Sequence, residues 1–266
     1  MSISFPSALS KPSGITASPS GTKRPAFGTL YGFDSSGDEG GGAAFSQQYA
    51  VEFDGTDEYM TTGYTFAGST FSASMWVKPT LGGGNRWIGD STTGLTGMRL
   101  DFGNKGTNWF VRLGAGQSTR KTVSAAAVND GAWHHVVLTI NGTYVKIYVD
   151  GSTTGGDVWT AGSPLSAGSN AVMVGRGTGL YDGLMDEVAF WDVELSSSDV
   201  TTLYNNGAVS DISSVGNSGA GPFAFWRMGD NDGGTGTTIT NLGSGGSTNN
   251  GSFPNGITFE STDIPS

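Results

Sequence analysis

From residue 49 onward the chain is a series of short segments in which apolar and polar residues alternate. The clearest are YAVEF, FSASMWVKP, GMRLDF, NWFVRLG, AWHHVVLTI, TYVKIYVDG, NAVMVGR and LMDEVAFWD. Glycine, asparagine, aspartate and serine separate them, and these residues favour turns. Alternation with a period of two is typical of strands that bury one face. No helical stretch that could cross between parallel strands lies among them, so the pattern predicts an antiparallel sandwich.

Two local elements are predicted in more detail. Asn141-Gly142 lies between two alternating segments and predicts a two-residue type I′ hairpin. On its second strand three residues then face the core, namely Val145, Ile147 and Val149, and the residues between them, including Tyr148, face outward. A short helix is predicted after Ser196, with Ser196 as N-cap and Asp199 completing a capping box. Gly207 is the predicted terminator, and the buried stripe is Val200, Leu203 and Tyr204.

Composition and the pattern of apolar and polar residues divide the chain into three parts. Residues 1–44 are dominated by Ser, Gly, Pro and Thr without a sustained period, and we interpret them as an arm for attachment or oligomerisation. Residues 45–207 carry the alternating segments and the helix. Residues 208–266 begin as a linker-like stretch, continue as the aromatic segment FAFWRMGDN and end in a polar tail. We expect this last part to complete or extend the sandwich with one or more extra strands.

Composition and charge exclude several classes of function. Twenty-nine aromatic residues (14 Phe, 8 Tyr, 7 Trp) supply apolar area for a large core, which a disordered chain lacks. The formal charge is −10 with 13 basic residues, and there is no basic stripe of the kind that binds nucleic acid. The absence of cysteine excludes disulfides and thiolate chemistry. Neither a signal peptide nor a membrane span is expected, because no apolar stretch is long enough.

Four segments, in this order and spacing, resemble the laminin-G-like domains of the concanavalin A-like group: FDGTDEYM, FSASMWVKP, NDGAWHHVVLTINGTYVKIYVDG and GLYDGLMDEVAFWDVELSSSDVTTLYNNG. The resemblance covers about residues 49–207. It implies an all-β fold, a two-sheet antiparallel jelly-roll sandwich with one short helix and extended terminal segments. This agrees with the strand pattern read from alternation alone.

The segment FAFWRMGDNDGGTGTTITNLGSGG and the following TFESTDIPS resemble the part that trails such domains in structural proteins of tailed bacteriophages. This resemblance implies a non-enzymatic virion protein, a capsid decoration or appendage component, made in the host cytoplasm. Its expected partners are other virion proteins and further copies of itself. Fold alone does not fix function, so this expectation rests on analogy.

A carbohydrate-binding adhesin for host-surface glycans is the alternative. Exposed aromatic rings stack on sugars, and four rings lie beside glycine-rich turns: Trp87, Trp109, Trp159 and Tyr181. Rings of this kind also serve as core residues, and the sequence does not separate the two roles.

A glucan hydrolase is a third and weaker hypothesis. Glycosidases need two carboxylates flanking the scissile bond. Alternation would point the adjacent Asp186 and Glu187 to opposite sides, whereas Glu52 and Asp54 share a face near the end of a strand. The two histidines, His134 and His135, are neighbours on a strand and should also point apart, which excludes joint metal ligation.

Calcium is the one cofactor expected, because it takes oxygen ligands from acidic loops. The candidate ligands are Asp54, Asp57 and Asp186. The alternative is that Asp54 and Asp57 cap turns and that Asp186 bonds neighbouring amides.

Overall fold

A computed structural model describes residues 45–80, 84–90, 100–105, 108–114, 119–124, 128–142, 144–153, 159–160 and 165–266. Residues 45–266 form one compact unit. The arm expected at residues 1–44 lies outside the described residues.

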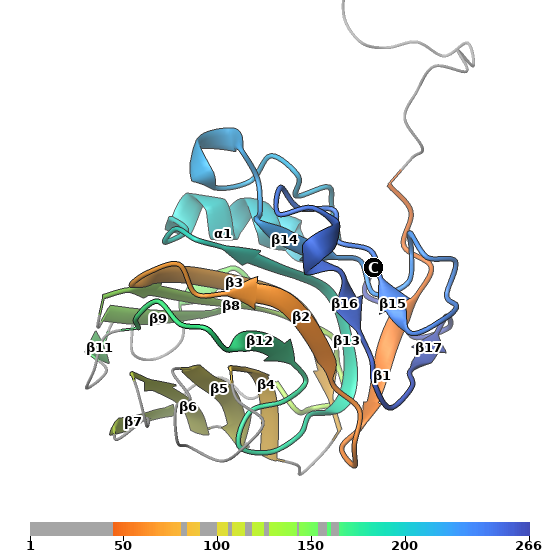
Figure 1. Ribbon diagram of the computed structural model, residues 1–266, viewed down its shortest axis with the longest axis horizontal. Helices are drawn as coiled ribbons and strands as arrows, with labels where there is room; N and C mark the ends of the chain where they lie inside the picture. Colours follow the sequence, from red (N-terminus) through yellow and green to blue (C-terminus); the bar gives the residue numbers. More distant parts are fainter. Residues whose placement is uncertain are drawn as a thin grey trace, which may run out of the picture. The chain divides into compact units, whose positions relative to one another are not determined.

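Two antiparallel sheets pack face to face, as Figure 1 shows. In the described part of the chain, sheet A has the order β10-β9-β8-β3-β13-β1-β17, with β11 pairing with β9 and β14 with β13. Its strands are β1 (Ala50–Asp54), β3 (Thr70–Pro79), β8 (His134–Asn141), β9 (Tyr144–Val149), β10 (Ser152–Thr153), β11 (Trp159–Thr160), β13 (Asp182–Trp191), β14 (Ala224–Trp226) and β17 (Thr258–Glu260).

Sheet B has the order β15-β16-β2-β12-β4-β5-β6-β7 over the same described ranges. Its strands are β2 (Met60–Thr65), β4 (Gly84–Gly89), β5 (Leu100–Lys105), β6 (Asn108–Leu113), β7 (Thr119–Ser124), β12 (Ala171–Val174), β15 (Thr238–Ile239) and β16 (Gly251–Ser252). The two sheets confirm the all-β sandwich that the alternating pattern predicts.

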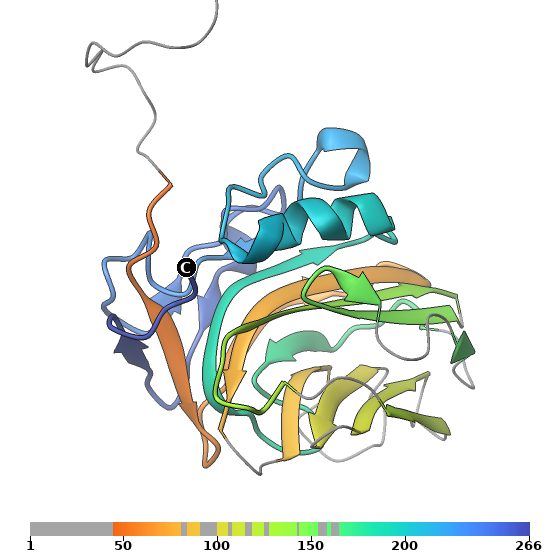
Figure 2. The same cartoon turned by 180° about the vertical axis from the view of Figure 1, so that it is seen from behind.

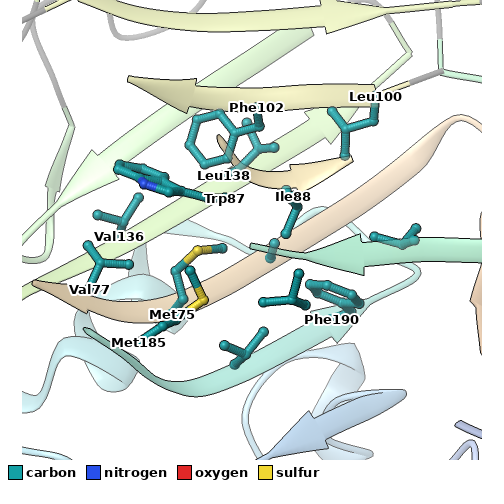
Figure 3. Close-up of a cluster of buried hydrophobic side chains, with 14 of the residues drawn as sticks. Met75, Val77, Trp87, Ile88, Leu100, Phe102, Val136, Leu138, Met185 and Phe190 are labelled. Carbon is teal, nitrogen blue, oxygen red and sulfur yellow. The ribbon is translucent and has the colours of Figure 1, made fainter. Parts of the chain in front are cut away.

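The main core fills the space between the sheets. Figure 3 shows Met75, Val136 and Met185 of sheet A together with Trp87 and Phe102 of sheet B. The predicted core face of β9 is confirmed, since three residues belong to this cluster: Val145, Ile147 and Val149. Burial of such side chains stabilises the fold by about 1.5–3 kcal/mol each.

The hairpin forms between the expected strands, but its turn is shifted by one residue. Asn141 pairs with Tyr144, so Asn141 ends β8 and the loop begins at Gly142, whose φ is +61°. Tyr148 faces outward as expected, but it is buried, because it packs in a second apolar cluster on the outer side of sheet A.

That second cluster lies beneath helix α1 (Ser197–Tyr204), which runs across the outer face of sheet A (Figure 2). The capping box is confirmed, because Ser196 and Asp199 bond each other's backbone amides. The helix ends earlier than expected: Asn205, with a φ of +45°, is its C-cap in place of Gly207. Short 3-10 turns follow in the C-terminal part at Asn205–Gly207, Asn217–Gly219 and Ser247–Asn249.

The C-terminal part extends both sheets. Strands β14 and β17 pair within sheet A, and β15 and β16 pair within sheet B. Five of its side chains lie in the main core: Ala224, Trp226, Met228, Ile239 and Phe253. Residues 208–266 therefore complete the sandwich, which is one of the two roles that the sequence left open.

Strand β13 contains a bulge at the acidic pair. Its register against β3 shifts between Asp186 and Ala189, and Glu187 has a φ of +48°, which is uncommon for a residue with a side chain. Met185 and Val188 both face the main core, so two residues separate them where strict alternation allows one or three. The expectation that Asp186 and Glu187 point to opposite sheet faces is therefore wrong.

Candidate functional site

A pocket lined by aromatic rings opens on the outer side of sheet A. Its volume is about 210 Å³, and its lining comprises Trp76, Trp133, Asp150, Tyr204, Gly207 and Ser266. Trp76 comes from β3, Trp133 immediately precedes β8, Asp150 follows β9 and Tyr204 ends α1. Neighbouring strands and the helix that covers them thus bring these side chains together.

The rings of this aromatic pocket are held in fixed positions. Trp76 is 5% exposed, and its ring lies 5.2 Å from that of His135 and 6.3 Å from that of Tyr204. Trp133 donates a hydrogen bond of 3.0 Å from Nε1 to Asp263 Oδ1. Trp133 and Tyr204 are half-buried, so part of each ring remains accessible to a ligand.

Asp150 supplies a carboxylate to the pocket. Its Oδ1 accepts a hydrogen bond of 3.0 Å from the His135 amide, and its Oδ2 lies 2.8 Å from His134 Nδ1. Burial raises the pKa of Asp150, but the bonds from His134 and the amide outweigh burial and leave it lowered. The hydrogen bond to Asp150 and a second one to Asp130 in turn raise the pKa of His134, against the effect of burial.

The two histidines are expected to titrate far apart in a proton NMR titration of the ring signals. Burial lowers the pKa of His135 to about 4, whereas the pKa of His134 lies above its usual value of 6.5. His134 therefore loses its proton as pH rises through a pKa above 6.5, whereas His135 has already lost its proton at that pH. Coincident titration curves near pH 6.5 would contradict this arrangement.

A second cleft, of about 320 Å³, lies beside β1 and β13. Its charged lining residues are Glu52, Asp54, Lys78, Asp182 and Glu260. Lys78 Nζ lies 2.5 Å from Oδ2 of Asp263, the residue that also binds Trp133. Asp263 therefore joins the acidic cleft to the aromatic pocket.

Hydrogen bonds lower the pKa of two carboxylates of the acidic cleft, Asp54 and Glu260. Hydrogen bonds lower the pKa of Asp54, chiefly one with Glu58 and one with the Thr56 amide. Bonds from Thr262 lower the pKa of Glu260. A glycosidase acid needs a raised pKa, so these two groups remain ionised where a proton donor would be required.

The predicted metal ligands separate into two places. Ligand oxygens of Asp54, Asp57 and Glu58 lie within 4.8 Å of one another, a donor set that suits a hard cation such as calcium. The same oxygens serve turns, since Asp54 Oδ1 accepts from the Thr56 amide at 2.7 Å. Asp186 belongs to neither the cluster nor the cleft, because it is fully buried elsewhere. The sequence missed Glu58, which follows Asp57 directly.

Asp186 instead belongs to a buried ionic network around Arg227. Glu187 Oε1 accepts from Arg227 Nε at 2.9 Å, and Asp230 Oδ2 lies 2.6 Å from Arg227 Nη2. Asp186 accepts from Gln47 Nε2, and Gln47 Oε1 accepts from Arg227. Burial raises the pKa of all three acids, Asp186, Glu187 and Asp230, which share one guanidinium.

This network also attaches residues 45–49 to the sandwich. Arg227 donates to the Ser46 carbonyl at 2.7 Å and lies 3.8 Å from the centre of the Phe45 ring. Asp230 Oδ1 accepts from the amides of Gln48 and Tyr49, each at 2.8 Å.

Three of the four aromatic residues predicted to bind a glycan are buried in the core. Trp87, Trp109 and Tyr181 are 0% exposed and lie in the main core. Their rings cannot reach a ligand, so the alternative that they are core residues is the one the structure supports. Trp159 begins β11, and its side chain lies outside the described part of the chain.

The aromatic pocket was not predicted from sequence. Its members are separated by up to 190 positions, from Trp76 to Ser266, and only the strand order brings them together. The one local signal is Asp150-Gly151, a turn pair that directly follows an alternating strand.

No helix in the described residues has the length and apolarity to span a bilayer.

Comparison with known proteins identifies the fold family. A family model described as the concanavalin A-like lectin/glucanases superfamily matches residues 53–201. The comparison with curated protein sequences gives no match.

Several solved structures are similar. A putative carbohydrate-binding protein from Bacteroides ovatus is 20% identical with a TM-score of 0.58, covering 82% of this chain and 61% of that one. A heptameric SAP-like pentraxin from Limulus polyphemus is 18% identical with a TM-score of 0.48, covering 59% and 82%. Domain 4 of an arabinanase from Geobacillus stearothermophilus, solved with arabinotriose, is 20% identical with a TM-score of 0.45, covering 58% and 76%. With the two sheets described above, the match shows that the chain belongs to the concanavalin A-like lectin/glucanases superfamily, as a laminin-G-like jelly roll.

Proposed function

We propose that this protein is a non-catalytic carbohydrate-binding module. The observation that carries the proposal is the aromatic pocket, in which accessible parts of Trp133 and Tyr204 lie beside the carboxylate of Asp150. Aromatic faces pack against the apolar C–H faces of sugar rings, and a few fixed polar groups select hydroxyls. Lectins of the same superfamily make the assignment consistent with the fold.

The size and charge of the pocket indicate the kind of ligand. Its volume of about 210 Å³ is below the range of about 300–1,000 Å³ that is usual for drug-sized ligands, so it suits one sugar unit or the end of a chain. Asp150 already accepts from the His135 amide and from His134, which fixes its orientation. A carboxylate held in this way would accept hydrogen bonds from sugar hydroxyls and would repel acidic sugars. The ligand class is therefore a neutral glycan.

Replacing Trp133 with alanine is expected to weaken glycan binding about tenfold or more. The change removes stacking and buried apolar area, together worth about 1.4 kcal/mol or more. A glycan array would identify a ligand, and calorimetric titration of its oligosaccharide would measure the change in affinity.

Tyr144→Ala provides the matched control. Tyr144 is 59% exposed and is not part of the pocket, so its loss should leave the affinity unchanged. Equal affinity of the Trp133 variant and the unaltered protein, or no binding to any glycan on the array, would contradict the proposal. Release of reducing sugar from mixed polysaccharides, abolished by Glu52→Gln, would instead favour a hydrolase.

We also propose that Asp54, Asp57 and Glu58 bind a calcium ion, because their ligand oxygens lie within 4.8 Å of one another. We expect calcium to raise the thermal unfolding midpoint and chelator to reverse the rise, since an ion that binds the folded state stabilises it by mass action. The Asp57→Asn variant should lose the response, and Asp211→Asn, a change at an exposed acid outside the cluster, should retain it. An identical midpoint with calcium and with chelator would count against the site.

A role in a virion is a separate proposal, and it rests on the resemblance of residues 223–246 and 258–266 to segments of phage structural proteins. In that case residues 1–44 would attach the sandwich to partner proteins or to further copies of itself. Incorporation into particles of a chain that lacks residues 1–44, at the level of the full chain, would argue against the attachment role.

A further inference from the structure

A small cavity lies beneath the C-terminal end of helix α1, and Trp76 lines both this cavity and the aromatic pocket. Its volume is about 10 Å³, and its lining comprises Ser74, Trp76, His135, Glu187, Leu203, Val209, Ser210 and Ile212. Strands β3, β8 and β13 supply the polar residues Ser74, His135 and Glu187. The cavity is thus enclosed by sheet A below and by the helix and the segment after it above.

Two polar atoms of this lining lack a hydrogen-bond partner among the described residues. They are Nδ1 of His135 and Oε2 of Glu187. His135 is 2% exposed and Glu187 is 4% exposed, so bulk water does not satisfy these atoms. The other polar atom of each side chain is engaged: His135 Nε2 lies 2.8 Å from Ser74 Oγ, and Glu187 Oε1 accepts from Arg227. Buried polar atoms in folded proteins are nearly always paired, with protein groups or with ordered water.

We infer that this cavity is a binding site for one water molecule that bridges His135 Nδ1 and Glu187 Oε2. A cavity of roughly 10–15 Å³ is the smallest that holds a water, and such a water needs two to four polar partners. The cavity meets the first condition at its lower limit, and the two unpaired atoms meet the second.

The protonation chemistry favours water over any fixed group. The His135 ring is neutral at neutral pH because burial lowers its pKa to about 4, so one ring nitrogen carries a proton and the other accepts. If Ser74 donates to Nε2, Nδ1 is a donor; if Nε2 donates to Ser74, Nδ1 is an acceptor. Water satisfies Nδ1 in either tautomer, and it can donate to Glu187 Oε2 when that carboxyl is ionised or accept from it when it is protonated. This hydrogen-bonded chain would join Ser74, His135, the water, Glu187 and Arg227 across three strands.

A high-resolution crystal structure of the full chain tests the inference directly. We expect one well-occupied water peak within hydrogen-bonding distance of both atoms. An empty cavity, or a direct bond between His135 and Glu187, would overturn the inference.

Oxygen-17 relaxation dispersion of the solvent supplies an independent measurement in solution, since it reports water molecules that stay buried. His135→Phe keeps a ring of similar shape but removes both nitrogens, and we expect it to lower the dispersion amplitude by the share of one molecule. The matched control is His134→Phe, the neighbouring histidine outside the cavity, which should leave the amplitude unchanged. Equal amplitudes for His135→Phe and the unaltered protein would refute the site. Because the crystallographic test uses the unaltered chain, it decides the question even if the His135 variant does not fold.

Discussion

Replacing Arg227 with methionine is expected to destabilise the protein by about 3–5 kcal/mol. Arg227 is the guanidinium that Glu187 and Asp230 share, and the side chains of the Arg227–Glu187 pair are 8% and 4% exposed. Its loss leaves buried carboxylates without a counter-charge and removes its contacts to Phe45 and Ser46. Denaturant unfolding followed by tryptophan fluorescence would measure the change in unfolding free energy.

The loss should be larger at high pH than in mild acid. Burial already raises the pKa of Asp186, Glu187 and Asp230 above their unfolded values. Without Arg227 these pKa values rise further, so the folded variant must hold protons that the unfolded chain releases as pH increases. The deficit therefore shrinks as the pH falls toward the unfolded carboxyl pKa of about 4.

Lys146→Met is the matched control for the Arg227 variant. Lys146 pairs with Glu194 at 3.1 Å, but the two side chains are 32% and 28% exposed, so this pair should contribute about 0–1 kcal/mol. If both variants lose the same small amount of stability, the network around Arg227 does not stabilise the fold in the way described.

Replacing Trp226 with alanine is expected to cost about 3–5 kcal/mol of stability. Trp226 is 0% exposed, its ring packs edge-on against Phe190 at 5.2 Å, and its Nε1 donates to the Asn249 carbonyl at 2.9 Å. The substitution opens a large cavity and leaves a buried carbonyl unpaired. Equilibrium denaturation would report the loss as a lower midpoint.

Trp133→Ala offers a control with the same change of side chain. Trp133 is half-buried in the aromatic pocket, so its removal should affect glycan binding far more than stability. A Trp226 variant as stable as the Trp133 variant would mean that residues 208–266 are an appendage and do not complete the core.

Much of the fold was predictable because the signal was local. Alternation identified the strands of the sandwich, and Ser196 with Asp199 marked the start of α1, since a capping box needs only neighbouring residues. The shifted turn at Gly142 and the burial of Tyr148 were not predictable, because both depend on what packs against the hairpin. The pairing partners of residues 208–266 were not predictable either, since their strands are short and pair with distant segments.

The candidate site was much less predictable than the fold. A tryptophan beside a glycine has the same local sequence whether its ring is buried, as for Trp87, or partly accessible, as for Trp133. Acidic residues close in sequence, Asp54 and Asp57, were correctly grouped because a tight turn keeps them together. Asp186 was misplaced because a single backbone irregularity changed the direction of its side chain.

That irregularity has a consequence for how β13 can evolve. Before the bulge the core-facing residues of β13 have odd numbers, up to Met185. After the bulge they have even numbers, from Val188 onward. The extra residue therefore changes which positions along the strand face the core. Loss of one residue there would remove the bulge and restore a uniform count, with Val188 and Phe190 still facing the interior. Deletion of Glu187 would therefore preserve the core face of β13 but remove the carboxylate that Arg227 contacts.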